Sequence, residues 1–538
     1  MHLRMTGNSD SASPTSSPEP SRRIALLLSG LLIATAWMIY HPEHARPLYY
    51  LDFAEFIPLL DAGTGFADRT RLLVEYYGGE GRFNLVPYAM LAVKWDLFGW
   101  WSPGWQIARA LLMIIVFALA YVLLRRLGAS RTGGLAGASV FLWAPAASEG
   151  WVRMTMAEPM GIAIALVMTI RATRFHDNPR WRRECAILGA GTVTLILTKE
   201  LLAPLILLPV VVALTMRPDG TFSTPSRSAR NIALFLTVLV AAAATMAPVV
   251  IIYLSADSSS YSSLYGREMQ SPVALLAIWL SGLVPFDLVG APGNAGWLIA
   301  FVGATILLAA GWRIGFDFDR RARWLLLIAL AVPLAGVLAY TPNPWFARFY
   351  LLPYLTGAAI LTGMAVTYLQ ARGRSAAILA VTCWVGMSVY AISTAALLAA
   401  RTDAVQRRDD RLVAFVHDSH DADTVVIAMA RPFPADLVAE TSVTGAPRGL
   451  GANLRRFSQT SDRPWPPTRE ASCDDGRSTI ARSRGVVVLN LEESCDLGTD
   501  RTAHRIVYRY RRFDWSALRL VHDSTQARAF RIPAAPPN

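Results

Sequence analysis

The chain carries little charge and almost no lysine. Only 17% of its 538 residues are Asp, Glu, Lys or Arg, against about 25% in an average soluble domain. Lys94 and Lys199 are the only lysines, and every other basic residue is arginine. No basic tract interleaved with aromatic residues is present, so the net charge of +12 does not indicate a nucleic-acid partner.

Several catalytic motifs are also absent. The sequence has no Walker A motif, no HExxH motif, no Gly-x-Ser-x-Gly elbow and no Cys/His spacing typical of a metal site. Nucleotide hydrolysis, zinc proteolysis and serine hydrolysis therefore have no support. There are only four cysteines. Two of them, Cys473 and Cys495, are candidates for a disulfide if their part of the chain faces an oxidising compartment.

Hydrophobic residues make up 53% of the chain and are concentrated in blocks. A helix of ~20 apolar residues crosses the ~30 Å hydrocarbon core of a bilayer. The sequence therefore predicts a polytopic α-helical membrane protein whose first span covers residues 24–40. The segment 273–290 is broken by prolines and is expected to be interfacial or re-entrant. Further spans are expected at about 106–124, 132–148, 154–171, 185–198, 201–216, 231–254, 295–312, 324–341, 347–369 and 376–400.

The arginines between the blocks predict the orientation. Arginine-rich and arginine-poor loops alternate, and the positive-inside rule places the rich loops in the cytoplasm. With about eleven spans, residues 1–21 are expected to form a disordered cytoplasmic tail and residues 22–400 the membrane domain. A single span across 185–216 would reverse every later loop, and the polar Lys199-Glu200 step in its middle favours two short helices. The arginine-rich loops contain Arg125, Arg126 and Arg131; Arg171, Arg174, Arg180, Arg182 and Arg183; Arg217, Arg227 and Arg230; Arg313, Arg320, Arg321 and Arg323; and Arg372 and Arg374.

Residues 401–538 are expected to form an extracytoplasmic soluble domain of the α/β class. An amphipathic helix is predicted at about 403–417, and the segment 444–480 is rich in Gly, Pro, Ser and Arg and is predicted to be a loop. Short β-rich runs lie at 424–429, 485–491, 505–510 and 518–521.

The first outer loop, residues 41–105, is long for a compact bundle. Asp52 and Glu55 are three residues apart and would share one face of a helix. Asp52 is a candidate catalytic carboxylate or, alternatively, a helix cap or a solvated loop residue. The segment 84–101 is apolar apart from Lys94 and Asp96 and is flanked by tryptophans, which predicts a helix along the outer membrane surface.

Other ionisable residues lie at the outer ends of the predicted spans. Glu149 and Arg153 are four residues apart and would form a simple ion pair. Glu158 lies in an apolar stretch, where a charge is either functional or part of a buried ion pair that joins two helices.

Two cations at the same side are candidates for binding phosphate. Lys199 either binds a phosphate as a point charge or pairs with its neighbour Glu200. Arg348 begins a span from the outer side, where the positive-inside rule does not explain an arginine. It either binds a phosphate or contacts lipid headgroups.

The order of these motifs resembles the GT-C superfamily of membrane glycosyltransferases, which includes protein mannosyltransferases and the aminoarabinose and galacturonosyl transferases of lipopolysaccharide. The shared features are an early acidic residue in the first outer loop, here Asp52, and a Lys-Glu pair that interrupts an apolar block, here Lys199-Glu200. Two further elements match: Gly81-Arg82-Phe83 with Pro87, and Arg348-Phe349 with Pro353. The family often has two adjacent acids in the first loop, whereas this chain has Asp52 and Glu55.

The resemblance implies a fold, a reaction and a site. It implies transfer of a sugar from a polyprenyl-phosphate donor to a glycan, lipid or protein acceptor at the outer face of a bacterial cytoplasmic membrane. Asp52, with Glu55 as the other candidate, would be the base, and Arg348 and Lys199 would bind the donor phosphate. A divalent metal is left open. The supporting residues would be Glu149, Arg153, Glu158, Glu200 and Arg82.

Two other classes of function remain. A transporter or lipid flippase would show repeated halves and ionisable residues near the membrane midplane. A scaffold for envelope assembly would use the C-terminal domain to bind a partner. The absence of a clear repeat and the outer placement of the candidate charges favour the enzyme.

Overall fold

The structure is a computed structural model of a mostly helical protein. It describes residues 22–40, 53–79, 83–99, 101–152, 157–217, 222, 228–255, 320–340, 348–393 and 395–396, together with the strands 425–429, 468–471, 486–490 and 505–509. The predictions for residues 1–21, 273–290, 295–312, 403–417 and 518–521 lie outside these residues.

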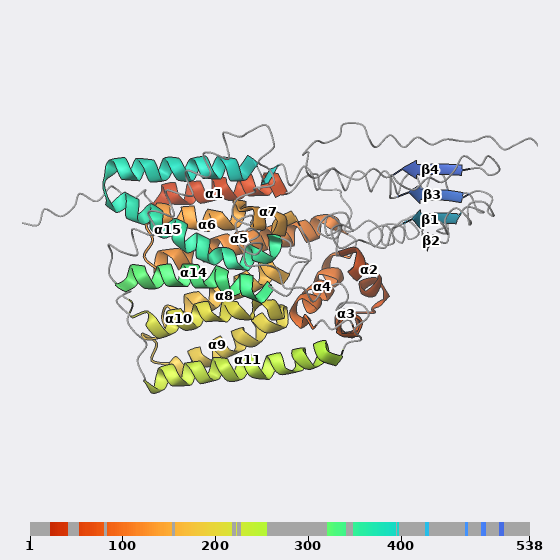
Figure 1. The fold of residues 1–538 in the computed structure, drawn as a ribbon, viewed down its shortest axis with the longest axis horizontal. Coiled ribbons are helices and arrows are strands. Elements are labelled where there is room, and N and C mark those ends of the chain that lie inside the picture. Colours follow the sequence, from red (N-terminus) through yellow and green to blue (C-terminus); the bar gives the residue numbers. More distant parts are fainter. Residues whose placement is uncertain are drawn as a thin grey trace, which may run out of the picture.

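Most of the described helices form one bundle (Figure 1). The bundle helices are α1 (Arg22–Tyr40), α5 (Ser102–Arg126), α6 (Arg131–Trp143), α7 (Pro145–Val152), α8 (Ala157–Ala172), α9 (Trp181–Thr198), α10 (Leu207–Thr215), α11 (Ala229–Ser255), α14 (Arg320–Tyr340), α15 (Leu355–Ala371) and a last helix over Arg374–Ser393. Two 3-10 helices, η1 (Glu200–Ile206) and η3 (Arg348–Tyr354), precede α10 and α15.

Five helices among the described residues are long and apolar enough to cross a membrane. Their hydropathy is high because the apolar blocks contain few ionisable side chains. Much of the surface of four of them is exposed on the protein, as expected of helices that face lipid, whereas Leu351–Ala371 is mostly buried in the bundle. They cover Arg22–Tyr40, Pro103–Arg126, Ala229–Ile252, Leu351–Ala371 and Arg374–Ser393.

One predicted span is two helices. The segment 132–148 was expected to be a single span, but α6 ends at Trp143 and α7 begins at Pro145. Ala144 between them has ψ 145°, an extended value. A proline disfavours helical geometry in the residue before it, which explains the break, while Pro145 itself fits the first turn of the new helix.

The arginine-rich loops meet at one end of the bundle, which we call the arginine end. Arg126 at the end of α5 donates to the carbonyl oxygen of Ile170 near the end of α8, at 2.8 Å. Arg230 at the start of α11 donates to the carbonyl oxygen of His176 in the loop after α8, also at 2.8 Å. The loops predicted to share one side of the membrane therefore lie side by side.

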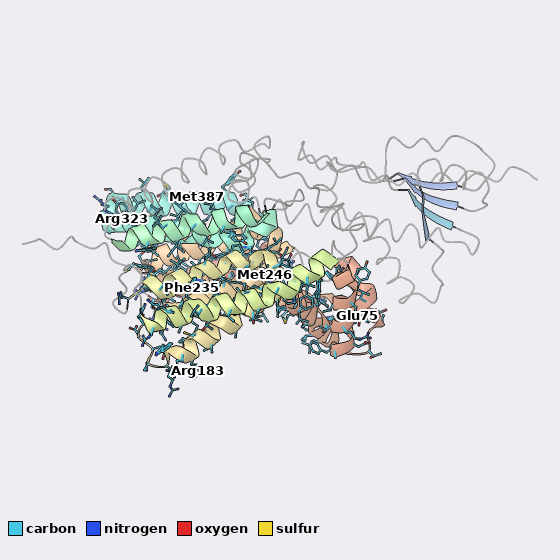
Figure 2. The ribbon with its side chains drawn as sticks, turned by 60° about the horizontal axis from the view of Figure 1, so that its bottom comes forward. Glu75, Arg183, Phe235, Met246, Arg323 and Met387 are labelled. Atoms are coloured by element: carbon cyan, nitrogen blue, oxygen red, sulfur yellow. The ribbon has the colours of Figure 1, made fainter. Side chains whose placement is uncertain are left out.

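The side-chain view shows the same separation. Figure 2 places Arg183 and Arg323 at the arginine end and Glu75, from the first outer loop, at the other end of the protein. The segment between α4 and α5 and the segment between α9 and α10 lie far from the arginine end (Figure 1).

The chain reverses direction within 185–216. At the start of α9, Glu184 pairs with Arg171 at the arginine end, with an Nη2–Oε1 distance of 2.5 Å. At the end of α10, the backbone of Leu214 interacts with His176, also at the arginine end. The turn between the two helices is at Lys199. This agrees with two short helices and disagrees with one continuous span.

The closest helix packing joins α6 to α15. A Cβ atom added at Gly137 would overlap the carbonyl oxygen of Ala359, and one added at Gly133 would overlap that of Gly363. Residues four apart lie on one helix face, so small residues on both helices let the two backbones approach closely.

The first outer loop forms its own small helical unit. It contains α2 (Phe53–Ala62), α3 (Phe66–Gly79) and α4 (Leu85–Phe98), and α4 also packs against α5 and α9. The helix predicted over 84–101 is α4. The core of the unit consists of Leu60, Leu73, Tyr77, Tyr88, Leu91, Trp95 and Trp105.

The described part of 401–538 is a four-stranded parallel sheet with the order β2-β1-β3-β4. Strands β1 (Val425–Met429), β3 (Val486–Asn490) and β4 (Arg505–Arg509) match three of the predicted runs. The prediction of a loop throughout 444–480 is wrong, because β2 (Thr468–Ala471) pairs with β1. Its residues are polar, so its strand conformation depends on the pairing rather than on an apolar pattern.

Candidate functional site

The elements that carry several of the candidate site residues meet at the end of the bundle opposite the arginine end. Here α7 packs against η3, and the start of α8 lies against both η1 and η3. We call this region the η1–η3 end. It combines segments that lie up to about 200 residues apart in the sequence.

Lys199 and Glu158 form a buried ion pair at the η1–η3 end. The ammonium nitrogen of Lys199 lies 2.5 Å from Oε1 of Glu158, and the two side chains are 15% and 1% exposed. Lys199 has an extended backbone, with φ −169° and ψ 128°, at the turn after α9. Glu158 is in the first turn of α8, where the helix dipole favours a carboxylate. Of the two alternatives for Glu158, the structure shows the buried ion pair that joins two helices.

Glu200 has a different environment from the one that the sequence suggested. Its neighbour Lys199 binds Glu158, which lies 41 residues earlier. Oε2 of Glu200 is buried and has no hydrogen-bond partner in the part of the chain that the structure describes. A buried acceptor without a donor is costly, so this oxygen is available to a hydroxyl group that enters the site.

The position of η3 is fixed by contacts with its neighbours. The hydroxyl of Tyr354 donates to the carbonyl oxygen of Leu201 in η1 at 2.5 Å. Gly336 in α14 lies under the ring of Tyr354, where any larger residue would overlap it. Leu352 covers Gly150 in α7, at 2.9 Å from where a Cβ would be. These contacts determine where the backbone of Arg348, the first residue of η3, lies.

The other predicted site residues are placed less completely. The backbone is described for Glu55 in α2, Glu149 in α7 and Arg348 in η3. Asp52, Arg82 and Arg153 lie outside the described residues.

A second polar cluster, which the sequence reasoning did not identify, lies where α1, α5 and α7 meet. The hydroxyl of Tyr40 donates to the carbonyl oxygen of Leu142 at 2.5 Å and is 2.8 Å from Oγ of Ser148. The guanidinium of Arg109 donates to the carbonyl oxygen of Tyr40. Arg109 is the only Asp, Glu, Lys or Arg within the predicted span 106–124, and this rarity was the available signal.

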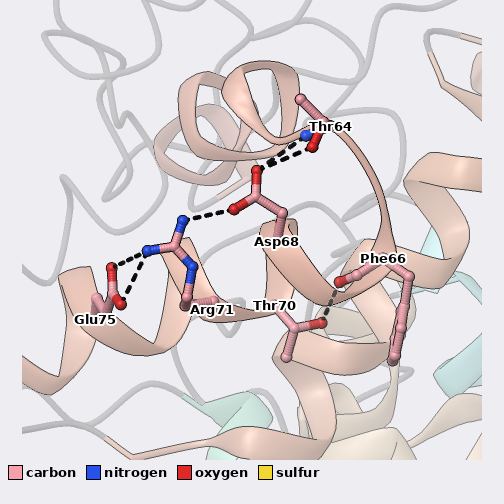
Figure 3. Close-up of polar contacts among 6 residues, drawn as sticks. All are labelled: Thr64, Phe66, Asp68, Thr70, Arg71 and Glu75. Atoms are coloured by element: carbon pink, nitrogen blue, oxygen red, sulfur yellow. Dashed lines mark hydrogen bonds and ion pairs between the residues drawn. The ribbon is translucent and has the colours of Figure 1, made fainter.

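The first outer loop carries an exposed ion network (Figure 3). Asp68 accepts from the backbone N–H of Thr64 at 3.1 Å and from Arg71 at 2.6 Å. Arg71 also binds Glu75. The bond from Arg71 holds the pKa of Asp68 below its usual value. These side chains are solvated, so the network stabilises the surface of α3 and is no candidate for catalysis.

One further ion pair joins α3 to α4, because Arg69 binds Asp96. Asp96, which stands two residues after Lys94, is therefore paired with Arg69.

Among the described residues there is no group of three or more His, Cys, Asp or Glu side chains that could hold a metal ion.

No family model and no curated protein matches the chain. Among solved structures, it is similar to ArnT from Cupriavidus metallidurans bound to undecaprenyl phosphate, with 12% identity, coverage of 83% of this chain and 90% of that one, and a TM-score of 0.43. It is also similar to the mycobacterial arabinofuranosyltransferase AftD, with 15% identity and a TM-score of 0.43, over 77% of this chain and 31% of AftD. This chain thus spans about a third of AftD.

A third similar structure is the oligosaccharyltransferase of Archaeoglobus fulgidus, with 10% identity over 79% of this chain and 63% of that one, and a TM-score of 0.40.

Proposed function

We propose that the protein is a membrane glycosyltransferase that moves a sugar from a polyprenyl-phosphate donor to a glycan, lipid or protein acceptor. The observation that carries this proposal is the meeting of α7, α8, η1 and η3 at one end of the bundle. These elements, with the turn before η1, bear Glu149, Glu158, Lys199, Glu200 and Arg348. Carboxylates and cations in one place are what a transfer from a phosphate leaving group needs.

The orientation that suits this reaction follows from charge. If the arginine end faces the cytoplasm, the η1–η3 end is extracytoplasmic. A lipid-linked donor would then hold its prenyl chain in the bilayer and its sugar beside this end. Residues 401–538 would form a soluble domain on the same side and contribute to acceptor selection. The location that fits best is the cytoplasmic membrane of a bacterium.

In the proposed reaction, Asp52 removes the proton of an acceptor hydroxyl, with Glu55 as the other candidate base. The hydroxyl oxygen bonds to the anomeric carbon of the sugar. The bond between that carbon and the phosphate oxygen breaks, and the phosphate leaves with the bonding electrons. Lys199 and Arg348 stabilise the leaving phosphate, because fixed cations in a dry site favour developing negative charge.

Other residues would orient these groups. Glu158 fixes the ammonium of Lys199. The buried oxygen of Glu200 would accept a hydrogen bond from a sugar or acceptor hydroxyl. Glu149, Arg153 and Arg82 are proposed to support the site from α7 and from the first outer loop.

The test is a transfer assay with the full-length protein in nanodiscs and a panel of radiolabelled polyprenyl-phosphate sugars. Replacing a general base lowers the rate about 10²- to 10⁴-fold. Asp52→Asn is expected to show such a loss, while the exposed Glu75→Gln variant, as the matched control, keeps the wild-type rate.

An unchanged rate in Asp52→Asn would remove Asp52 as the base. A wild-type protein that transfers no sugar from any donor but moves labelled lipid across liposomes would instead be a flippase.

A further inference from the structure

Two cations, Lys94 and Arg109, come from the two helices α4 and α5 that pack together near the end of α1. The ammonium nitrogen of Lys94 in α4 is 5.8 Å from the centroid of the Trp105 ring. Trp105 is four residues before Arg109, so both side chains are on one face of α5. Arg109 donates to the carbonyl oxygen of Tyr40, the last residue of α1.

The environment penalises the charge on Lys94. Burial lowers the pKa of Lys94 to about 8, and the positive charge of Arg109 contributes in the same direction. Two like charges that are removed from water are costly unless a counter-charge is present.

The described part of the chain supplies no such counter-charge. No Asp or Glu among these residues forms an ion pair or hydrogen bond with Lys94 or Arg109. Asp96, the nearest acid along α4, is bound to Arg69. The other lysine of the protein shows the contrast, since Lys199 has Glu158 as its partner.

We propose that Lys94 and Arg109 form a binding site for a phosphate group. Neither residue is fully buried. A guanidinium binds phosphate oxygens through parallel N–H bonds, and an ammonium attracts them as a point charge. The same phosphate chemistry is offered by a lipid headgroup and by a free phosphate.

This site does not depend on the proposed transferase activity. It uses none of the residues assigned to the base or to the leaving phosphate, and it would bind an anion in a transporter as well. A binding measurement therefore tests it separately from the transfer assay.

The sequence makes the experiment simple, because Lys94 and Lys199 are its only lysines. Reductive methylation with ¹³C-formaldehyde labels both side chains and keeps their positive charge. The full-length protein is placed in neutral phosphatidylcholine nanodiscs, and the two lysine resonances are titrated with pH by NMR. The Lys94→Met variant assigns the signals.

Without an added anion, the Lys94 signal is expected to titrate well below the usual lysine value. Added inorganic phosphate, or phosphatidic acid in the nanodisc, should raise that midpoint by about one to three pH units, as a nearby opposite charge does. The Lys199 signal is a separate reporter, for the proposed donor-phosphate site. Arg109→Gln should weaken the response of Lys94, and Arg71→Gln, which changes an exposed arginine of α3, should leave it intact.

The outcomes decide the proposal. A response to phosphatidic acid alone assigns a lipid headgroup, and a response to inorganic phosphate assigns a site for soluble phosphate. A normal midpoint for Lys94 without any anion would mean that the chain itself neutralises the pair, and this would overturn the proposal. A failure of both probes to move the signal would overturn it as well. These tests use the wild-type protein, so they stand even if Arg109→Gln does not fold.

Discussion

The ammonium of Lys199 and the carboxylate of Glu158 are 2.5 Å apart, although 40 residues separate them in the sequence. The pair joins the turn after α9 to the first turn of α8. It lies where η1 and η3 meet, so it fixes the region that carries the candidate site. Its energetic role can be separated from its chemical role by substitution.

Removing one partner of this pair should destabilise the protein strongly. Glu158→Gln or Lys199→Met leaves a buried charge without its counter-charge, which typically costs about 3–5 kcal/mol. The double variant should lose less than the sum of the two single variants, because neither charge remains. Unfolding by sodium dodecyl sulfate in mixed micelles measures the effect. Equal losses in Glu158→Gln and in the exposed Glu75→Gln variant would contradict a buried pair.

The hydroxyl of Tyr354 should matter for stability and for transfer. It bonds to the carbonyl oxygen of Leu201 and thereby holds η3 against η1. Tyr354→Phe removes this bond and should lower the free energy of unfolding by about 1–2 kcal/mol. Because Arg348 begins η3, the rate of the proposed transfer should fall as well. Tyr76→Phe, at an exposed tyrosine of α3, is the control. An unchanged melting temperature in Tyr354→Phe would show that η3 is held by other contacts.

A single methyl group added at the α6–α15 contact should destabilise the protein. In Gly137→Ala the new Cβ would overlap the carbonyl oxygen of Ala359, which belongs to the backbone and cannot rotate away. We expect a loss of about 1–3 kcal/mol, measured by thermal unfolding in detergent.

The matched control for that variant is Gly30→Ala in α1. Apart from the neighbouring residues and backbone of α1 itself, no described atom lies within 4 Å of a Cβ at Gly30. There, alanine has the better helix propensity and should be neutral or stabilising by up to about 1 kcal/mol. Equal effects of the two substitutions would contradict the close approach of α6 and α15.

Lys94 should make stability depend on pH in the alkaline range. Its pKa is about 8 in the folded protein and 10.5 as the unperturbed value. Between these values the unfolded chain binds more protons, so the contribution of Lys94 to the free energy of unfolding rises with pH. Below pH 8 the full penalty of burying the charged side chain is present.

The comparison of wild type with Lys94→Met isolates this contribution. From pH 7 to pH 10.5, in neutral lipid without added anions, wild type should gain at most about 3 kcal/mol relative to the variant. Parallel pH profiles would show that Lys94 is not desolvated.

Much of the helical framework could be predicted from the sequence, because the length of an apolar block and its flanking charges are local properties. The predicted spans at 24–40, 106–124 and 231–254 match α1, α5 and α11 to within a few residues. The two-helix interpretation of 185–216 also agrees with the structure, since an ionisable pair in the middle of an apolar block marks a turn.

Two sequence predictions were wrong because the local hydrophobic pattern did not determine the local structure. The break at Ala144 is caused by Pro145, which the hydrophobic pattern across 132–148 conceals. The strand Thr468–Ala471 has no apolar alternation and exists because β1 pairs with it.

The sequence by itself identified which charges stand in unusual places, because an ionisable side chain in or beside an apolar block is costly wherever the chain folds. The sequence identified Glu158 and Lys199 each as an unusually placed charge, but it did not identify them as partners. Only the tertiary structure decided which charges meet. In the structure, Lys199 pairs with Glu158. Lys94 and Arg109 come from helices that pack together and have no counter-charge among the described residues. Burial and the distance between remote segments, rather than residue type, set the strength of these electrostatic interactions.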